Sequence, residues 1–478
     1  MSTKTAGQRG IRAIVTRLFG VQYMLKPEQW QGNVPTSKEL YTNMLQLAWP
    51  SALESILISL IGSVDTMMVS TLGTAAIAAV GLTNQPKFIL LAIIFSLNTA
   101  ITAIVARRKG QKDQNGANST LRQGLMLSAP LSAILAALGY IFATPLMRFT
   151  GANEDTLLMS TQYFRIITVS IFFSAVCMTI NAAQRGAGNT RISMKTNILS
   201  NIVNLVLNYL LIGGKLGFPK LGVVGAGIAT LVGTVAGLIL AIFSVIGKHK
   251  FLHLDFKSKW TFDKETLKVI CSIGGSAMVE QVFMRIGFFT YTKIVAALGT
   301  VAYATHQICM NIINLSFAFG DGLTVASSSL VGHSLGAKKP DYAMAYGKIG
   351  QRLALIISTF LMLLFIFGRR FIVSLYSDDP AVIALGSIIL IIIACTTHSQ
   401  TSQVVFSGCL RGAGDTKFVA MVSLVSIGII RPILTYLLCI PFGVGLLGAW
   451  IGLLVDQYIR FTCSALRFRT GKWQKIKI

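Results

Sequence analysis

Twelve long apolar stretches run through the chain, and each is long enough to cross a lipid bilayer. A membrane-spanning helix needs about 20 mostly apolar residues. The stretches lie at 43–71, 75–106, 119–148, 156–184, 191–213, 220–246, 266–296, 302–332, 345–368, 380–408, 418–440 and 445–466. The segments that connect them are short. The pattern predicts an all-α polytopic membrane protein with twelve transmembrane helices, in contact with the lipid bilayer.

The charges support this class and indicate an orientation. Only 12% of the 478 residues are charged, yet the formal net charge is +25. Soluble proteins carry roughly 25% charged residues, and a nucleic-acid-binding domain places its basic residues on a soluble fold, so no nucleic-acid partner is expected. With the N-terminus in the cytoplasm, most Lys and Arg residues fall on the cytoplasmic side, as the positive-inside rule requires. We therefore expect a multi-pass protein of a bacterial cytoplasmic (inner) membrane with both termini in the cytoplasm.

The sequence matches itself when it is shifted by 226 residues. Leu-Gly-Thr at 72–74 falls on the same tripeptide at 298–300, and Arg-Gly-Ala-Gly at 185–188 falls on 411–414. Glu54 likewise falls on Glu280. Two repeats of six spans each have the same orientation, which predicts a pseudo-twofold axis along the membrane normal and a transporter plan. The predicted division is a basic N-terminal segment at 1–40, a first lobe at 41–247, a cytoplasmic linker at 248–265, a second lobe at 266–468 and a basic tail at 469–478.

An ordered set of short motifs carries a family resemblance. They are PSALESILISLIGSVDTMMVSTLG (50–73), AAVGLTNQ in the second stretch, VARRKG (105–110), AYATHQI (302–308), LVGHSLGAKKPD (330–341), the two RGAG turns, and DQYIRF…RFRTGKW (456–473). Together they resemble bacterial members of the multidrug and toxic compound extrusion (MATE) family. The resemblance implies a V-shaped fold of two six-helix lobes and no enzymatic reaction.

That resemblance also implies a function. It is a secondary multidrug exporter, a monomer that exchanges H⁺, or alternatively Na⁺, for small organic cations by alternating access. No cofactor is expected besides the coupling ion, and neither catalytic residues nor a metal site are expected. Two alternatives remain open: a flippase for lipid-linked precursors, and a transporter of the major facilitator type.

Five acidic residues lie within the apolar stretches: Glu54, Asp65, Glu280, Asp321 and Asp456. A charge at the bilayer centre costs about 2.5–3.5 kcal/mol on insertion scales, so each acid needs a partner, water or a proton. Asp65 has no basic neighbour in sequence, and desolvation favours its protonated form. The resemblance implies the same role, because the aspartate of its VDT motif is the central cation-coupling carboxylate. Asp65 is therefore the main candidate for coupling-ion binding.

A stripe of amides marks the fifth stretch. Asn197, Asn201, Asn204 and Asn208 follow one another at spacings that put them on one helical face. Amides can join helices by hydrogen bonds, or they can share an ion-binding network with Asp65. The resemblance implies the second role for Asn204 and Asn208, and Asn201 is a weaker candidate.

Glu54 and its repeat mate Glu280 occupy equivalent places in the first and seventh stretches. Two interpretations remain open for this pair. They are anions that bind a cationic substrate, or they form an inner gate through salt bridges, for example between Glu280 and Arg285.

The second repeat lacks two acids that sodium-coupled relatives of this type carry. The corresponding positions hold Met284 and Gln400, both uncharged, which favours H⁺ over Na⁺. Gln400 remains a candidate for substrate or ion binding. Asp321 is flanked by glycines, so it is expected either to line a cavity or to cap a local helix break.

Three further features have structural interpretations. Asp456 is expected to pair with Arg460 one turn later. Arg431-Pro432 predicts a kink in the eleventh span. The basic stretch Ile11–Leu25 is expected either to lie on the anionic inner leaflet or to be disordered.

Overall fold

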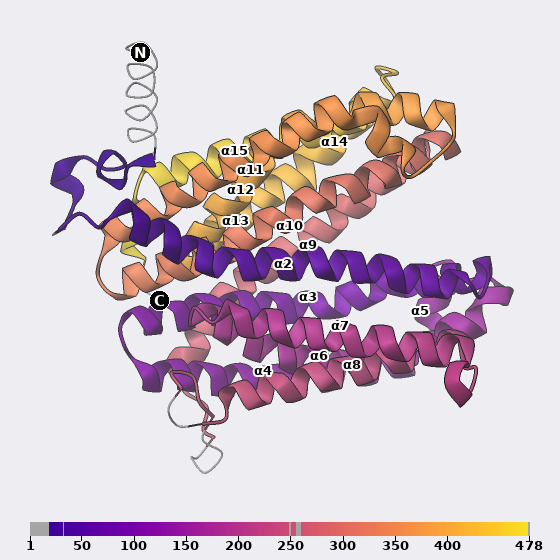
Figure 1. The fold of residues 1–478 in the computed structure, drawn as a ribbon, viewed down its shortest axis with the longest axis horizontal. Helices are drawn as coiled ribbons and strands as arrows, with labels where there is room; N and C mark the ends of the chain where they lie inside the picture. Colours follow the sequence, from indigo (N-terminus) through magenta and orange to yellow (C-terminus); the bar gives the residue numbers. More distant parts are fainter. Residues whose placement is uncertain (1–18, 32, 248–249, 255–259, 477–478) are drawn as a thin grey trace, which may run out of the picture.

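The computed structural model describes residues 19–31, 33–247, 250–254 and 260–476. Within these ranges the chain is helical and contains no β-strand, as the apolar stretches predict. The helices form two bundles that follow each other along the chain (Figure 1).

The first bundle holds α2 (Ser37–Ser70), α3 (Thr74–Gly110), α4 (Gln114–Ile141), the short α5 (Ala143–Phe149), α6 (Glu154–Gly186), α7 (Thr190–Gly213) and α8 (Gly222–Val245). The second holds α9 (Lys264–Ala296), α10 (Thr300–Gly336), α11 (Pro340–Ser374), α12 (Pro380–Gly412), α13 (Thr416–Ser423), a π-helical turn (Leu424–Ile430), α14 (Arg431–Cys439) and α15 (Leu446–Arg469). Most of these bounds agree with the predicted spans to within about six residues. The predicted span 119–148 is instead divided at Phe142 into α4 and α5.

Eleven helical segments of the described residues are long and apolar enough to cross a membrane. The predicted twelfth, α15, has the expected length of 24 residues but is not among the eleven. The reason is its charge: Asp456, Arg460, Arg467 and Arg469 lie within it.

The two bundles repeat each other's turns in detail. Gly73 has φ 102° and its repeat mate Gly299 has φ 104°, and Lys112 and Lys338 have φ 59° and 57°. The internal repeat seen in the sequence is therefore a repeat of local backbone conformation.

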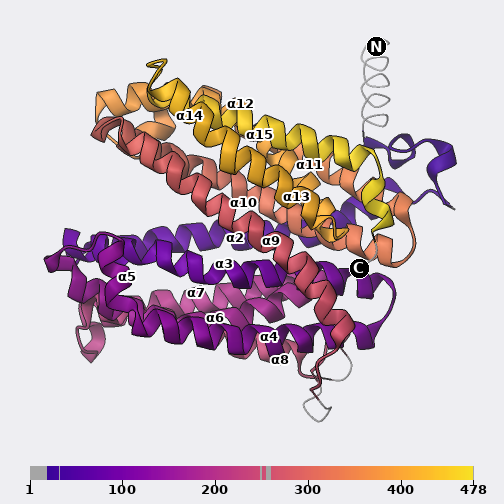
Figure 2. The same ribbon diagram turned by 180° about the vertical axis from the view of Figure 1, so that it is seen from behind.

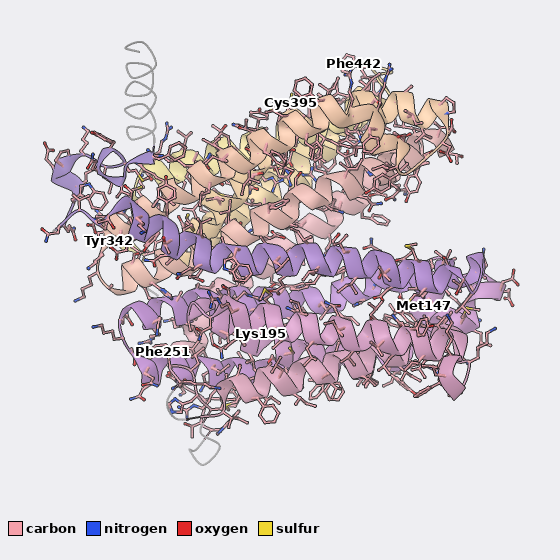
Figure 3. All side chains as sticks on the ribbon, in the orientation of Figure 1. Met147, Lys195, Phe251, Tyr342, Cys395 and Phe442 are labelled. Carbon is pink, nitrogen blue, oxygen red and sulfur yellow. The ribbon has the colours of Figure 1, made fainter. Side chains whose placement is uncertain are left out.

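The bundles lie closest at the end that holds the termini and diverge toward the opposite end (Figure 1). Phe251 and Tyr342 mark the near end, and Met147 and Phe442 mark the far end (Figure 3). Helix α2 packs on α10, and α3 packs on α9. The arrangement is a V whose apex is at the termini.

Helix α9 links the two bundles (Figure 2). Ile270 and Ile273 near its start pack into the hydrophobic core of the first bundle, while Tyr291 near its end belongs to the core of the second. Asp263 caps its first turn, accepting hydrogen bonds from the Glu265 amide and the Thr266 hydroxyl. These bonds hold the pKa of the Asp263 carboxyl below its usual range.

Close backbone contacts join the bundles at the apex. Gly110 and Gly336 are repeat mates that face each other there: a Cβ on Gly110 would lie 2.0 Å from the His333 carbonyl oxygen, and one on Gly336 would lie 2.1 Å from that of Arg107. The His333 ring Nε2 lies at hydrogen-bonding distance, 2.7 Å, from the carbonyl oxygen of Gly186. The apex is thus packed backbone against backbone, which only glycine permits at these positions.

The variant Gly110→Ala is expected to lower the free energy of unfolding by about 1–3 kcal/mol, the usual cost of overpacking. The matched control is Gly275→Ala on α9, where an added Cβ meets no atom within 4 Å. Thermal unfolding in detergent measures both variants. Equal melting temperatures for the two would contradict the tight packing of the apex.

The segments before α2 and after α15 pack on the bundles. Met24 is buried in the core of the second bundle, and the Lys348 ammonium donates a hydrogen bond to its carbonyl oxygen. The expectation that Ile11–Leu25 lies on the inner leaflet or is disordered is therefore wrong for residues 19–25, while residues 11–18 lie outside the described residues. In the tail, the carbonyl oxygen of Ile476 accepts a hydrogen bond from Arg107 of the first bundle at 2.7 Å.

Candidate functional site

The first bundle encloses a cavity of about 470 Å³ between α2, α3, α6, α7 and α8. This volume is in the range of small-molecule sites. The lining includes predicted residues, Asp65, Asn201, Asn204 and Asn208, and others that the sequence analysis did not single out, Asn84, Lys87, Tyr163 and Thr230. The cavity thus brings together residues from five helices around one carboxylate.

Asp65 is held by the amide stripe of α7. The Asn208 side-chain amide donates a hydrogen bond to Asp65 Oδ1 at 2.8 Å. When the Asn204 amide is oriented with its NH₂ toward the carboxylate, its nitrogen lies 3.0 and 3.1 Å from the two Asp65 oxygens, and its oxygen accepts from Thr230. This orientation follows from chemistry, because an ionised carboxylate only accepts hydrogen bonds. Asp65 is therefore a half-buried carboxylate that lines the cavity beside two amide donors from α7.

The four amides of the stripe belong to two different sites. Asn201, Asn204 and Asn208 all line the cavity. Asn197, two turns before Asn204, instead donates to Glu54 at 2.5 Å. The helical spacing was correctly recognised, but the four amides do not form one network around Asp65.

Glu54 and Glu280 form equivalent ion pairs outside the cavity. Glu54 lies 3.8 Å from Arg185, and Glu280 lies 2.5 Å from Arg411. Both arginines come from the RGAG turns, so the pairing obeys the internal repeat. Both carboxylates are buried. This geometry corresponds to the salt-bridge interpretation of the pair.

The predicted partner of Glu280 is wrong. The Arg285 guanidinium lies over the Phe88 ring of α3, 4.9 Å from its centroid. It therefore makes a cation–π contact between the two bundles rather than a salt bridge.

The two remaining candidates lie apart from the cavity. Gln400 is fully buried in α12, and neither atom of its amide group has a hydrogen-bond partner. Asp321 is exposed on α10. Its neighbour Gly322 packs against Ala48 of α2, so Asp321 lies beside the contact between the bundles.

The second bundle contains a buried charge cluster of a different kind. Asp456 is fully buried and pairs with Arg460 at 3.1 Å, as predicted, and also with Arg431, which was not predicted as its partner. The Ser426 hydroxyl is a third donor to this carboxylate, at 2.5 Å. Two guanidinium groups and a hydroxyl therefore surround this carboxylate.

A π-helical turn places Arg431 in this cluster. The turn Leu424–Ile430 interrupts the eleventh span and ends just before Arg431-Pro432, the pair expected to mark a kink. Such turns insert one residue into a helix.

The insertion shifts the repeat by one position beyond the turn. Gly225 lies in GVVGAG (222–227) and Gly448 in the similar GLLGAW (445–450), which matches it at a shift of 223 residues instead of 226. Gly225 packs on the Leu211 backbone, and Gly448 packs on that of Leu438, one residue beyond the repeat mate of Leu211. By this register Arg431 is the counterpart of Asn204. Its guanidinium lies 5.9 Å from the ring centroid of Tyr291, the repeat mate of Asp65.

Sequence reasoning missed four polar residues of the cavity, Asn84, Lys87, Tyr163 and Thr230. It named Arg431 only as part of a kink and not as a partner of Asp456. An isolated lysine in an apolar stretch carries a cost that marks it as unusual, so Lys87 was detectable. Nothing in the sequence alone connects Tyr163 to Asp65. Among the described residues, no group of three or more His, Cys, Asp or Glu residues is placed to hold a metal ion.

Comparison with known proteins gives consistent matches. The MatE family model matches residues 50–210 and 276–437. The probable multidrug resistance protein NorM of Thermotoga maritima is 27% identical over 440 residues, which cover 91% of this chain and 94% of that protein. The multidrug resistance protein PmpM of Pseudomonas aeruginosa is 29% identical over 387 residues, 80% of each chain. The crystal structure of a mutant of the Vibrio cholerae MATE transporter VcmN covers 91% of this chain and 97% of its own, with a TM-score of 0.84 at 19% identity. That last likeness concerns the fold alone.

Proposed function

The chain belongs to the MatE family of membrane transporters, and on this premise we propose that it is a secondary multidrug exporter driven by an ion gradient. It exchanges an inward-moving cation for outward-moving small organic compounds. The observation that carries this proposal is the Asp65 carboxylate, which faces a cavity of ligand size inside a membrane-spanning bundle while Asn208 orients it.

Asp65 is proposed as the site where the coupling ion binds. In the ionised state its carboxylate attracts a cation from the cavity. Binding of a proton removes that charge, so a cationic group held there loses its counter-charge and leaves. Ion entry and substrate release are thereby linked through one side chain, which is the requirement for antiport.

H⁺ is the coupling ion we favour over Na⁺. A sodium site needs several oxygen ligands, and the second bundle offers Met284 and Gln400 where acids would be expected. Its buried acid, Asp456, is already bound by two guanidinium groups. Among the described residues that line the cavity of the first bundle, Asp65 is the one carboxylate.

Both termini are proposed to lie in the cytoplasm of a bacterial cell whose inner membrane holds the protein. The two bundles diverge at the end away from the termini (Figure 1), so this orientation makes the structure an outward-open state. The cavity with Asp65 then lies in the outer half of the membrane, where protons enter.

Transport into vesicles tests the proposal. Purified protein is reconstituted, a pH gradient or a sodium gradient is imposed in separate experiments, and ethidium movement is followed by fluorescence. We expect movement driven by the pH gradient and little by the sodium gradient. Vesicles without protein are the control, and failure of both gradients to move ethidium would contradict the export function.

A further inference from the structure

The cavity of the first bundle carries a second charge that ion coupling does not use. Lys87 on α3 lines the same cavity as Asp65 and is half-buried. The two charges interact. Among the residues that the structure describes, however, Lys87 takes part in no ion pair, so its nitrogen lies more than 4.0 Å from the carboxylate oxygens.

A lone ammonium group in this position is unusual. It carries three hydrogen-bond donors and no acceptor, and a charge within a membrane segment is costly unless it is solvated or paired. Asp65 does not satisfy it, because its carboxylate lies beyond ion-pair distance of Lys87 and accepts hydrogen bonds from Asn208 and Asn204 of α7. Lys87 therefore lines the cavity with an ammonium group that has no hydrogen-bond or ion-pair partner among the described residues.

The two charges change what the cavity selects. With Asp65 ionised, the lining has one negative and one positive group and is neutral overall. A simple organic cation is attracted by the carboxylate and repelled by the ammonium. A ligand with a positive and a negative group complements both charges.

We propose that Lys87 binds the carboxylate of zwitterionic substrates while their cationic centre lies toward Asp65. This substrate class rests on the proposed export function. The remaining lining suits the body of such a compound, since Val69 and Ile77 offer apolar surface and Asn84 offers hydrogen bonds. A charge-assisted hydrogen bond to the ammonium would fix the orientation of the ligand.

Binding of two matched dyes tests this assignment. Tetramethylrhodamine carries a cationic xanthylium ring and a carboxylate, whereas its methyl ester carries the cation alone. Fluorescence polarisation with the full chain in detergent gives the dissociation constant of each. We expect the wild-type protein to prefer the zwitterion.

Three variants test whether the preference for the zwitterionic dye depends on Lys87. Lys87→Met is expected to weaken zwitterion binding about tenfold or more, the scale of a lost hydrogen bond to a charged group, and to leave ester binding equal or tighter. Lys87→Arg restores the charge and is expected to restore the preference. The matched control Lys293→Met, an exposed lysine in α9, is expected to change neither dye.

The inference is overturned if the wild type binds both dyes equally, or if Lys87→Met weakens both to the same extent. Ethidium transport, measured in parallel on the wild type, addresses the export function alone. Ethidium transport without a zwitterion preference would overturn the substrate class and leave the exporter in place. A preference dependent on Lys87 would support the site even if ethidium did not move.

Discussion

Asp65→Asn is expected to abolish export driven by a pH gradient, lowering the initial rate about 100-fold. A lost hydrogen bond to a charged group costs about 1.5–3 kcal/mol, and here the lost charge is also the proposed ion carrier. The substitution preserves the shape of the side chain but replaces one acceptor oxygen by an NH₂ group. That group would face the amides of Asn208 and Asn204, which donate to the carboxylate in the wild type.

Ethidium movement in reconstituted vesicles, with an imposed pH gradient, measures the effect. Asp378→Asn is the matched control, because it neutralises an exposed carboxylate between α11 and α12. The Asp378 variant should transport like the wild type. If the Asp65 variant also did so, the coupling role assigned to Asp65 would be wrong.

Asp456→Asn is expected to lower the free energy of unfolding by about 3–5 kcal/mol, the cost of leaving a buried charge without its partner. Asp456 is fully buried, and it is the anion that pairs with both Arg431 and Arg460. Removing its charge leaves two guanidinium groups side by side in an apolar bundle. The effect should appear as a lower midpoint of thermal unfolding in detergent.

A compensated variant separates lost pairing from lost packing. Replacing Arg431 and Arg460 by Met together with Asp456→Leu removes all three charges at similar volume, and such replacements often restore stability. Asp378→Asn again serves as the exposed control. A melting temperature of Asp456→Asn equal to that of the control would contradict the buried cluster.

The fold was predictable because its signals are local. Each span shows as a long apolar stretch, and each repeat shows as a matching spacing, so helix bounds such as Thr190–Gly213 differ from the predicted 191–213 by one residue at most. The link between Asp65 and Asn208 was also predictable, since one is an unpaired acid in an apolar segment and the other lies on an amide face.

Pairings between distant segments were harder to obtain. Glu280 has a basic residue five positions away, Arg285, yet it pairs with Arg411 from a turn far along the chain. The basic residue close to Glu280 in sequence was the wrong partner. Two groups on helices meet only when the helix faces that carry them pack together, whatever their distance along the chain. Lys87 shares its cavity with Asp65 for the same reason, since the turn between α2 and α3 folds the two helices back on each other.

The π-helical turn Leu424–Ile430 has a consequence for comparing the two halves as products of a gene duplication. One additional residue rotates the part of the helix that follows it by about 100° around the helix axis. As a result, the position that holds the amide of Asn204 in the first bundle holds the guanidinium of Arg431 in the second. In the second bundle the cationic group is therefore part of the chain, the Arg431 side chain. The first bundle is proposed to bind a cation from solution. Divergence of the duplicated halves has thus left one carboxylate facing a cavity, where we propose that it exchanges ions, and the other permanently bound by two guanidinium groups.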